Sequence, residues 1–291
     1  EIIGRLVGSE MCIRARYEDD CYLPKSTSLR VSRLGYYSEE QDESLITFNS
    51  LEEYLLTLKN YINNPNDKFK NISLDLKQQV NNGTIQMESE LYNHVRPKGI
   101  ISKDIRAYTQ LKNKGIEYLE IRSIDLNPYT KIGISLEDIE FLELVLIFCA
   151  LSDSPLISDL ESDCIKENIR RSSEAGQDCN FIGGLESENA EESAESATKE
   201  FLQKLQNFAF DIGLEKDSEK MFSEYTKRNN KPLSKKLIYD LEKYENLLAF
   251  IVKKSAPINH EINKDNRALF EKERDLSCLL YTSDAADEHS W

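Results

Sequence analysis

Residues 116–128 read IEYLEIRSIDLNP, and this stretch predicts the strand that organises the chain. β-branched and aliphatic residues favour an extended backbone, and the turn-forming NPYTKIG sequence that follows ends it. Side chains along a strand alternate between its two faces, so Glu120 and Arg122 emerge on the same face, roughly 6 to 7 Å apart at the backbone. The sequence therefore predicts a half-buried strand that presents opposite charges side by side.

The pair formed by Glu120 and Arg122 has two interpretations. A carboxylate suits a hard cation such as Mg²⁺ and a guanidinium suits phosphate oxygens, so together they could hold a metal ion and a nucleotide phosphate. The alternative is an ordinary exposed sheet face, on which a cross-strand ion pair contributes little stability. Spacing alone favours the ordinary sheet face.

A second extended stretch is expected upstream, where residues 83–98 read GTIQMESELYNHVRPK. In an extended chain Ile85, Met87 and Leu91 fall on one side, which is apolar. The opposite side is polar and consists of Gln86, Glu88, Glu90 and Tyr92. The pattern predicts a second strand with one buried face and one polar face.

Two capping-box spacings mark the beginnings of helices. Ser50 with Glu53 precedes a helix from about residue 51, and Ser135 with Asp138 opens a largely apolar helix at about 136–151. In the first helix the apolar residues repeat at helical spacing and form one face. That face consists of Leu51, Tyr54, Leu55, Leu58 and Ile62.

The layout divides the chain into four segments. Residues 1–16 and 278–291 lack periodicity and resemble translated sequencing adapters, so both are expected to be non-native, with genuine disordered tails as the alternative. Residues 17–155 combine strands with helices, and residues 156–277 are expected to be helical. The fold class is therefore α+β. Amphipathic helices are expected at 199–213, 234–254 and 261–275.

Composition limits the possible partners. The 291 residues include 52 acidic and 37 basic ones, and the formal net charge of -15 argues against a nucleic-acid partner. The longest apolar run, FLELVLIFCAL at 141–151, is too short to cross a bilayer. Six cysteines occur without CxxC pairs, which fits a reducing cytoplasm. We expect a cytoplasmic protein that binds neither nucleic acid nor a membrane.

Basic residues near two of these stretches could bind an anionic substrate. Arg30 and Tyr36 lie in a loop-rich stretch at 21–38, and Arg96 and Lys98 lie in the VRPK sequence. Arginine is the better carboxylate clamp because its planar fork of donors matches two oxygens. The alternative is that these are ordinary solvated loop charges.

Five long motifs follow one another along the chain, and together they resemble the gammaproteobacterial type of glutamate-cysteine ligase. The resemblance runs almost continuously over residues 22–155 and more weakly to about 275. The motifs are YLPKSTSLRVSRLGY at 22–36, ITFNSLEEYLLTLK at 46–59, ESELYNHVRPK at 88–98, GIEYLEIRSIDLNPYTKIGI at 115–134 and FLELVLIFCALSDSP at 141–155.

The resemblance implies a fold, a reaction and a set of small molecules. The fold is related to that of glutamine synthetase, an antiparallel sheet forming an open funnel with helices around it, present here in part. The reaction is the first step of glutathione synthesis, in which ATP drives the joining of the L-glutamate γ-carboxylate to the amino group of L-cysteine. ATP serves as co-substrate, Mg²⁺ as cofactor, and the intermediate is an acyl phosphate.

The resemblance also implies roles for single residues. Glu120 matches a carboxylate that binds magnesium, and Arg122 matches an arginine at the phosphoryl-transfer site. Arg30, Tyr36 and Tyr92 match residues around the cysteine substrate, and Arg30 is expected to hold the cysteine carboxylate. By this resemblance the pair of charges on the strand becomes a functional pair.

Nothing before Tyr22 matches the N-terminal half of the family, which supplies further metal ligands and substrate contacts. We therefore expect the chain to be the C-terminal part of a ligase and to be inactive without that missing half. Two alternatives remain open: a related carboxylate-amine ligase that uses another amine, and a non-catalytic acidic helical interaction protein.

Overall fold

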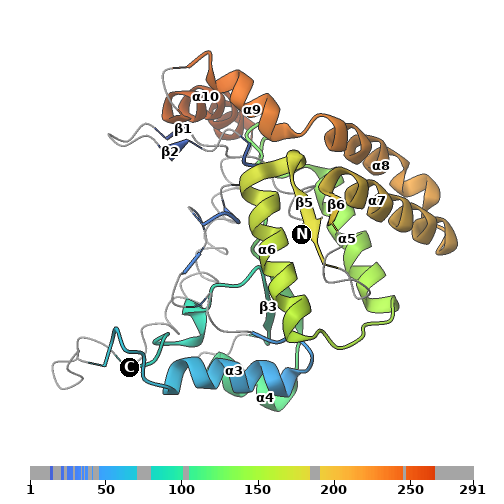
Figure 1. The fold of residues 1–291 in the computed structure, drawn as a ribbon. Coiled ribbons are helices and arrows are strands. Elements are labelled where there is room, and N and C mark those ends of the chain that lie inside the picture. The colour runs from blue at the N-terminus through green and yellow to red at the C-terminus, as the bar shows by residue number, and fades with distance from the viewer. Residues whose placement is uncertain are drawn as a thin grey trace. The chain divides into compact units, whose positions relative to one another are not determined.

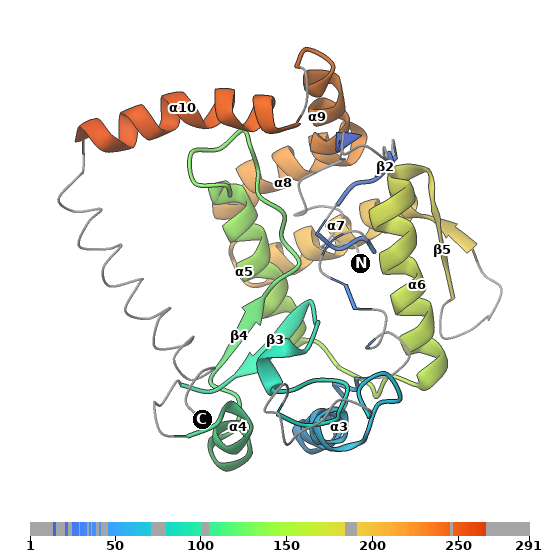
Figure 2. The same cartoon turned by 90° about the vertical axis from the view of Figure 1, so that its left-hand side faces the viewer.

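The computed structural model describes most of the chain and divides it into two compact units (Figures 1 and 2). The first unit contains Glu1–Tyr36 and Ser123–His260, and the second contains Tyr37–Arg122 and Glu261–Trp291. Each unit is described by itself below. The described residues are 14–15, 21–22, 25–28, 30–33, 35, 37–38, 41, 46–70, 80–100, 105–183, 191–244 and 247–265.

Helices and short antiparallel sheets make up both units, in keeping with the α+β class expected from the sequence. Among the described residues the strands pair as β1 with β2, β3 with β4, and β5 with β6. The second unit contains α3 (Leu51–Asn63), a 3-10 turn (Glu88–Glu90), β3 (Val95–Lys98), α4 (Ala107–Lys114) and β4 (Tyr118–Ile121). The first unit contains β1 (Arg14–Ala15), β2 (Cys21–Tyr22), α5 (Leu136–Leu151), α6 (Asp159–Ala175), a 3-10 turn (Gly176–Asp178), β5 (Asn180–Ile182), β6 (Glu191–Ser193), α7 (Ala194–Asp211), α8 (Glu215–Asn230) and α9 (Leu233–Leu241). The last described helix, α10 (Leu247–Asp265), begins in the first unit and runs past its boundary.

The core of the second unit forms on the apolar face of α3. As its sequence predicts, the helix begins at Ser50, whose Oγ accepts a hydrogen bond from the Glu53 N–H at 3.1 Å. Gly83 lies so close to the end of α3 that a Cβ there would be 2.2 Å from the Ile62 carbonyl oxygen, so only glycine fits. The buried core residues are Tyr54, Leu55, Leu58, Tyr61, Ile85, Leu91 and Leu111.

The prediction of one continuous strand across residues 83–98 is wrong. Only Val95–Lys98 form a strand, although Ile85 and Leu91 are buried as expected. Before Val95, side chains form hydrogen bonds with backbone groups that would otherwise pair with a neighbouring strand. This competition favours turns. The Gln86 side-chain oxygen accepts hydrogen bonds from the backbone N–H groups of residues 80 and 81 at 2.6 and 3.1 Å.

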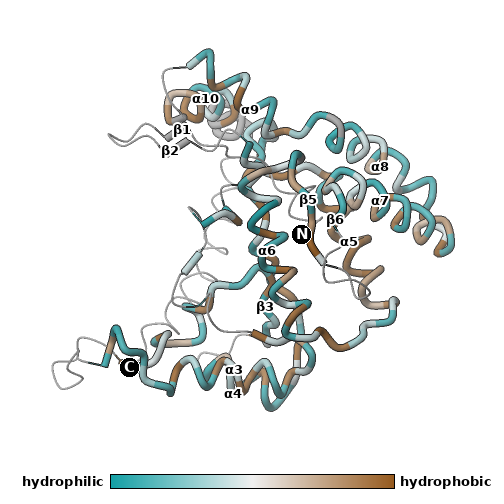
Figure 3. The backbone as a smooth tube through the Cα atoms, viewed as in Figure 1, coloured by the Kyte–Doolittle hydropathy of each residue, from teal (hydrophilic) through white to brown (hydrophobic). Residues whose placement is uncertain are grey.

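The core of the first unit lies between α5, α7 and α8. Figure 1 shows α7 and α8 side by side, and Figure 3 shows hydrophobic residues along α5 but mainly hydrophilic ones on α8. The rings of Phe141 and Tyr225 stack with their centroids 4.1 Å apart. The buried residues of this core are Phe141, Leu144, Val145, Leu202, Leu205, Ala209, Met221, Phe222 and Tyr225.

One buried carboxylate both caps α5 and binds α8. Asp138 forms the predicted capping box with Ser135, accepting the Ser135 N–H at 3.0 Å while its own N–H donates to the Ser135 hydroxyl at 3.2 Å. The same carboxylate accepts a hydrogen bond from the Tyr225 hydroxyl at 2.8 Å and forms an ion pair with Arg228. Its side chain and that of Arg228 are only 3% and 9% exposed, so the pair is shielded from water.

The helices after residue 156 agree with the predicted amphipathic segments only in part. Most of the segment 199–213 lies in α7, but the segment 234–254 is divided because α9 ends at Leu241 and α10 begins at Leu247. Helix α8 was not among the predicted segments. Residues 266–275 of the last predicted segment lie outside the described residues. In the part of the chain that the structure describes, no helix has the length and apolar character needed to cross a membrane.

The two ion pairs between α8 and the first turn of α5 predict different contributions to stability. Replacing Arg228 with alanine leaves Asp138 buried without its cation, and we expect the free energy of unfolding to fall by roughly 3 to 5 kcal/mol. The matched control is Lys220→Ala, because Lys220 pairs with Glu137 but its side chain is 80% exposed. That loss is expected to be much smaller, because water screens an exposed ion pair. If urea unfolding shows equal losses of free energy for the two variants, the buried Arg228–Asp138 pair does not stabilise the fold more than the exposed pair.

Candidate functional site

Figure 2 shows β3 beside β4 in the second unit. Their pairing brings charged side chains together. Glu120 on β4 lies opposite Arg96 on β3. The Arg122 Nε donates a hydrogen bond to the Glu120 Oε1 at 2.8 Å, and the Lys98 Nζ lies 3.7 Å from Oε2. The backbone N–H of Arg122 donates to the His94 carbonyl at 2.8 Å, which extends the pairing by one residue beyond β4. The two residues predicted to share a strand face therefore contact each other directly.

Three cations keep the Glu120 carboxylate charged. Burial alone raises the pKa of this carboxyl, but the Arg122 hydrogen bond and the charges of Arg122, Lys98 and Arg96 together hold it below its usual value. Its Oε2 atom is nevertheless buried and has no hydrogen-bond partner among the described residues. An anionic oxygen in that state has capacity left to bind a further cation.

The environment of Glu120 fits a magnesium ligand. Mg²⁺ prefers hard oxygen donors and is usually held by one or two carboxylates together with substrate phosphates and water. Glu120 would supply one such oxygen. Within the described ranges no group of three or more His, Cys, Asp or Glu residues could by itself hold a metal ion.

Arg96, one of the basic residues predicted to bind an anionic substrate, donates hydrogen bonds to the backbone. It is 4% exposed, and its Nη2 donates to the carbonyl oxygens of Ser89, at 2.9 Å, and Leu91. These contacts fasten the turn before β3, which carries Tyr92. The Tyr92 N–H donates to the Gln41 side chain at 2.7 Å, while the residue remains 40% exposed. Tyr92 thus has a fixed backbone and an accessible ring.

Arg30 belongs to the first unit, where it lies half-buried in a loop described at residues 25–28 and 30–33. Its backbone N–H donates to Asp125 Oδ1 at 3.0 Å, and the Ser28 hydroxyl donates to Asp125 Oδ2. Tyr36, the remaining predicted substrate residue, lies outside the described residues. The structure therefore joins Glu120 and Arg122 and places Tyr92 in the same unit, whereas Arg30 belongs to the other unit.

Sequence reasoning missed Asp125, although this residue lies in the stretch 116–128 that predicts the strand. It is only 6% exposed, and burial raises the pKa of its carboxyl to about 6, although the hydrogen bonds from Ser28 and Arg30 and the charge of Arg30 act to lower it. The available signal was an acidic residue in an otherwise apolar run that directly follows a strand. Periodicity could not identify its partners, which precede it by almost a hundred residues.

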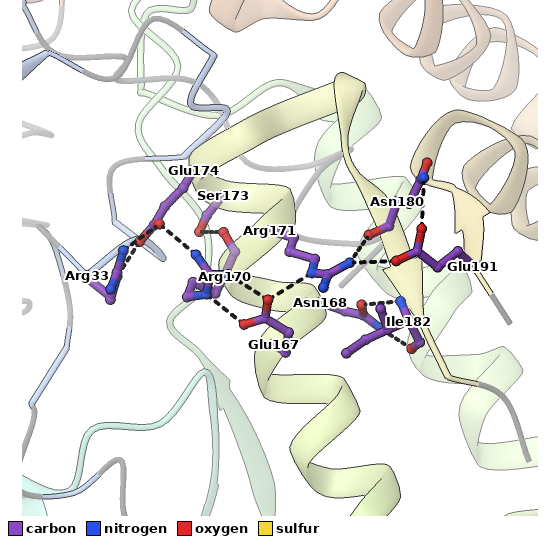
Figure 4. A network of polar contacts seen from close by, with 10 residues as sticks. All are labelled: Arg33, Glu167, Asn168, Arg170, Arg171, Ser173, Glu174, Asn180, Ile182 and Glu191. Carbon is purple, nitrogen blue, oxygen red and sulfur yellow. Dashed lines mark hydrogen bonds and ion pairs between the residues drawn. The ribbon is translucent and has the colours of Figure 1, made fainter. Parts of the chain in front are cut away.

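A network of ion pairs connects the Arg30 loop to α6 and β5–β6 (Figure 4). Arg33 donates two hydrogen bonds to Glu174, at 2.7 and 2.9 Å, and Arg170 joins Glu174 to Glu167. Arg170, with help from Arg171, lowers the pKa of Glu167 to about 2. Arg171 also reaches β6, with its Nη1 3.6 Å from a Glu191 oxygen.

Comparison with known proteins decides the family. A family model described as glutamate-cysteine ligase matches residues 8–172. The chain belongs to the glutamate-cysteine ligase family. The match begins within the segment 1–16, whose non-native origin remains a prediction.

Alignments with two curated relatives cover 67% or more of this chain. It is 36% identical over 265 residues to the glutamate-cysteine ligase of Wigglesworthia glossinidia brevipalpis, an alignment that covers 86% of this chain and 51% of that protein. With the Photorhabdus laumondii enzyme it shares 37% identity over 198 residues, or 67% of this chain and 38% of the relative. The chain thus spans about half, or less, of the length of the curated relatives it matches.

Solved structures confirm the fold expected for the family. A glutamate-cysteine ligase from Francisella tularensis, solved in complex with AMP, superposes with a TM-score of 0.81 at 22% identity and covers 99% of this chain and 60% of its own. A bifunctional glutathione synthetase from Pasteurella multocida gives a TM-score of 0.66 at 19% identity and covers 91% and 31%. At these identities the likeness carries the fold alone.

Asp125 predicts a specific dependence of stability on pH. Its folded pKa of about 6 lies above the value of 3.8 for an unperturbed carboxyl, so folding favours the protonated form. The associated stability is fully present below about pH 4 and is lost as the pH rises through about 6, a change of roughly 3 kcal/mol. We expect Asp125→Asn, which cannot ionise, to gain that amount relative to wild type between about pH 4 and pH 7. Urea unfolding of both proteins checks this, and a difference that stays constant with pH would contradict it.

Proposed function

We propose that the protein containing this chain joins the γ-carboxylate of L-glutamate to the amino group of L-cysteine at the expense of ATP, in the first step of glutathione synthesis. The observation that carries the proposal is the Glu120–Arg122 pair within a chain of the glutamate-cysteine ligase family. Because the chain spans about half the length of its curated relatives, the activity is proposed for a protein that also contains the other half. Such a biosynthetic enzyme would work in the cytoplasm.

The reaction needs an activated carboxyl group, because a carboxylate is a poor electrophile. Transfer of the γ-phosphoryl group from ATP to a γ-carboxylate oxygen of glutamate gives ADP and an acyl phosphate. The cysteine amino group then attacks the acyl carbon, phosphate leaves with the transferred oxygen, and the amine loses a proton. Charge builds on the transferring phosphoryl group, so this step depends mainly on positioning and electrostatic stabilisation.

Arg122 and Glu120 have complementary roles in this proposal. Arg122 orients the phosphoryl group and stabilises its charge, since a guanidinium matches the geometry of phosphate oxygens. Glu120 holds Arg122 through Oε1, and its Oε2 atom, which is buried and has no hydrogen bond among the described residues, would bind a magnesium ion. When bound, Mg²⁺ would neutralise negative charge on the ATP phosphates. One carboxylate thus serves both the metal and the arginine.

The acceptor is assigned to three further residues. Arg30 binds the cysteine carboxylate, and Tyr36 and Tyr92 surround the amino acid. The exposed Tyr92 ring on its fixed backbone supports this assignment. Further metal ligands and the glutamate contacts are proposed to come from the other half of the family's length, so this chain alone should not catalyse the ligation.

Arg122→Ala in the full-length protein should remove a preorganised donor at the reacting phosphoryl group. The expected loss in transition-state stabilisation is about 2 to 4 kcal/mol, read from kcat/KM for ADP release dependent on glutamate and cysteine. Arg106→Ala is the matched control, because the side chain of this arginine of the same unit is 54% exposed and its Nε lies 3.7 Å from a Glu88 oxygen. Unchanged turnover in the Arg122 variant would favour the non-catalytic alternative, and ADP release that ignores cysteine would favour a ligase for another amine.

Glu120→Gln should weaken metal binding because an amide is a poorer ligand than a carboxylate for a hard cation. We expect about tenfold or weaker affinity for Mn²⁺, used as a spectroscopic substitute for Mg²⁺ in the presence of ATP, a loss of the order found when groups at metal sites are changed. Glu117→Gln provides the control, since Glu117 accepts a hydrogen bond from the Ile100 N–H and an amide oxygen can replace it. Equal affinities of the Glu120 variant and wild type would remove Glu120 from the metal site.

A further inference from the structure

Asp125 is a buried carboxylate with both oxygens committed to the loop that carries Arg30. Oδ1 accepts the Arg30 backbone N–H at 3.0 Å, and Oδ2 accepts the Ser28 hydroxyl. The Ser28 Oγ in turn accepts the Val31 N–H at 3.1 Å. A single carboxylate therefore fixes the backbone on both sides of residue 29 and through residue 31.

The far side of the same loop is held by the end of α6. The Thr27 N–H donates to the Ser173 carbonyl at 2.8 Å, and its hydroxyl donates to the Ser172 carbonyl at 2.6 Å. Gly176 lies against the loop at a φ of +66°, and a Cβ there would be 2.3 Å from the Lys25 carbonyl oxygen. These contacts hold the loop at residues 25 and 27, and the Asp125 hydrogen bonds hold it at Ser28 and Arg30.

Packing alone does not explain a carboxylate at this position. Asp125 is 6% exposed, and it accepts hydrogen bonds from the Ser28 hydroxyl and the Arg30 backbone N–H. Burial raises the pKa of its carboxyl in spite of these bonds. The charge of Arg30 acts on the Asp125 carboxyl, so the two side chains are electrostatically coupled as well as linked through the backbone. A buried charge that opposes its own burial is expected where it serves a function.

We propose that Asp125 is a positioning residue, which sets the Arg30 loop in the conformation that binds the carboxylate of the amino-acid acceptor. The inference rests on the proposed function, in which Arg30 holds the cysteine carboxylate. Asp125 itself touches no substrate and acts through Ser28 and the Arg30 backbone. Its loss should therefore impair binding of the acceptor and leave the binding of glutamate and ATP intact.

The test uses steady-state kinetics of the full-length enzyme with Asp125→Asn, Ser28→Ala and Arg30→Ala. We expect Asp125→Asn to raise the KM for cysteine about tenfold or more, because small displacements of a positioning group have large kinetic effects. The Ser28→Ala change, which removes one of the two hydrogen bonds, should give a smaller rise. The values of kcat and the KM values for glutamate and ATP should stay within about twofold of wild type. The melting temperature of Asp125→Asn at neutral pH should equal or exceed that of wild type.

The matched control is Asp138→Asn, which changes a buried carboxylate of the same unit that binds no part of the loop. It should lower the melting temperature without a selective change in the KM for cysteine. If Arg30→Ala raises that KM and Asp125→Asn does not, the positioning role is overturned while the assignment of Arg30 stands. If Arg30→Ala leaves it unchanged, the assignment of Arg30 fails and the inference fails with it. A fall in melting temperature with equal rises in all three KM values would make Asp125 a purely structural residue.

Discussion

The antiparallel pairing of β4 with β3 is the constraint on which the candidate site depends. The register sets Glu120 opposite Arg96 and brings Lys98 within 3.7 Å of the same carboxylate. A shift of one residue would turn Glu120 to the other face, because the side chains of a strand alternate with a period of two. Arg96 also fixes the preceding turn through two backbone carbonyls, so the pairing positions Tyr92 as well. One short sheet therefore determines both the charge cluster and the turn beside it.

Glu120 and Asp125 show how environment divides the roles of two carboxylates only five residues apart in the sequence. Arg122, Lys98 and Arg96 outweigh burial at Glu120 and lower its pKa, whereas burial outweighs the hydrogen bonds at Asp125 and raises its pKa. The first group stays anionic and suits a cation. The second accepts hydrogen bonds from Ser28 and Arg30 in the loop that carries Arg30. Groups whose environments shift their pKa values in opposite directions are the usual way in which one chain assigns different tasks to the same chemical group.

Local patterns in the sequence were sufficient for some elements and insufficient for others. The helices after Ser50 and Ser135 were predictable because capping spacing and apolar periodicity are both encoded within a few residues. The strand face shared by Glu120 and Arg122 follows from alternation in the same way. The turns at 80–91 were not predictable, since the side chain of Gln86 competes with strand pairing while the apolar alternation stays the same. The role of Asp125 was invisible for another reason, because its partners at Ser28 and Arg30 lie far away in the sequence.

The two buried carboxylates of the first unit, Asp138 and Asp125, have different environments. Asp138 has a cation, a tyrosine hydroxyl and a helix N-terminus as partners, so its charge is neutralised within the core. Asp125 accepts hydrogen bonds from the Ser28 hydroxyl and the Arg30 backbone N–H, and burial raises the pKa of its carboxyl in spite of these bonds and the charge of Arg30. Removing a partner from the first kind of site exposes a large penalty, whereas removing the charge from the second relieves one. Asp125 lies outside the loop that carries Arg30 but binds its backbone, so the proposed positioning role accounts for a charge that costs stability.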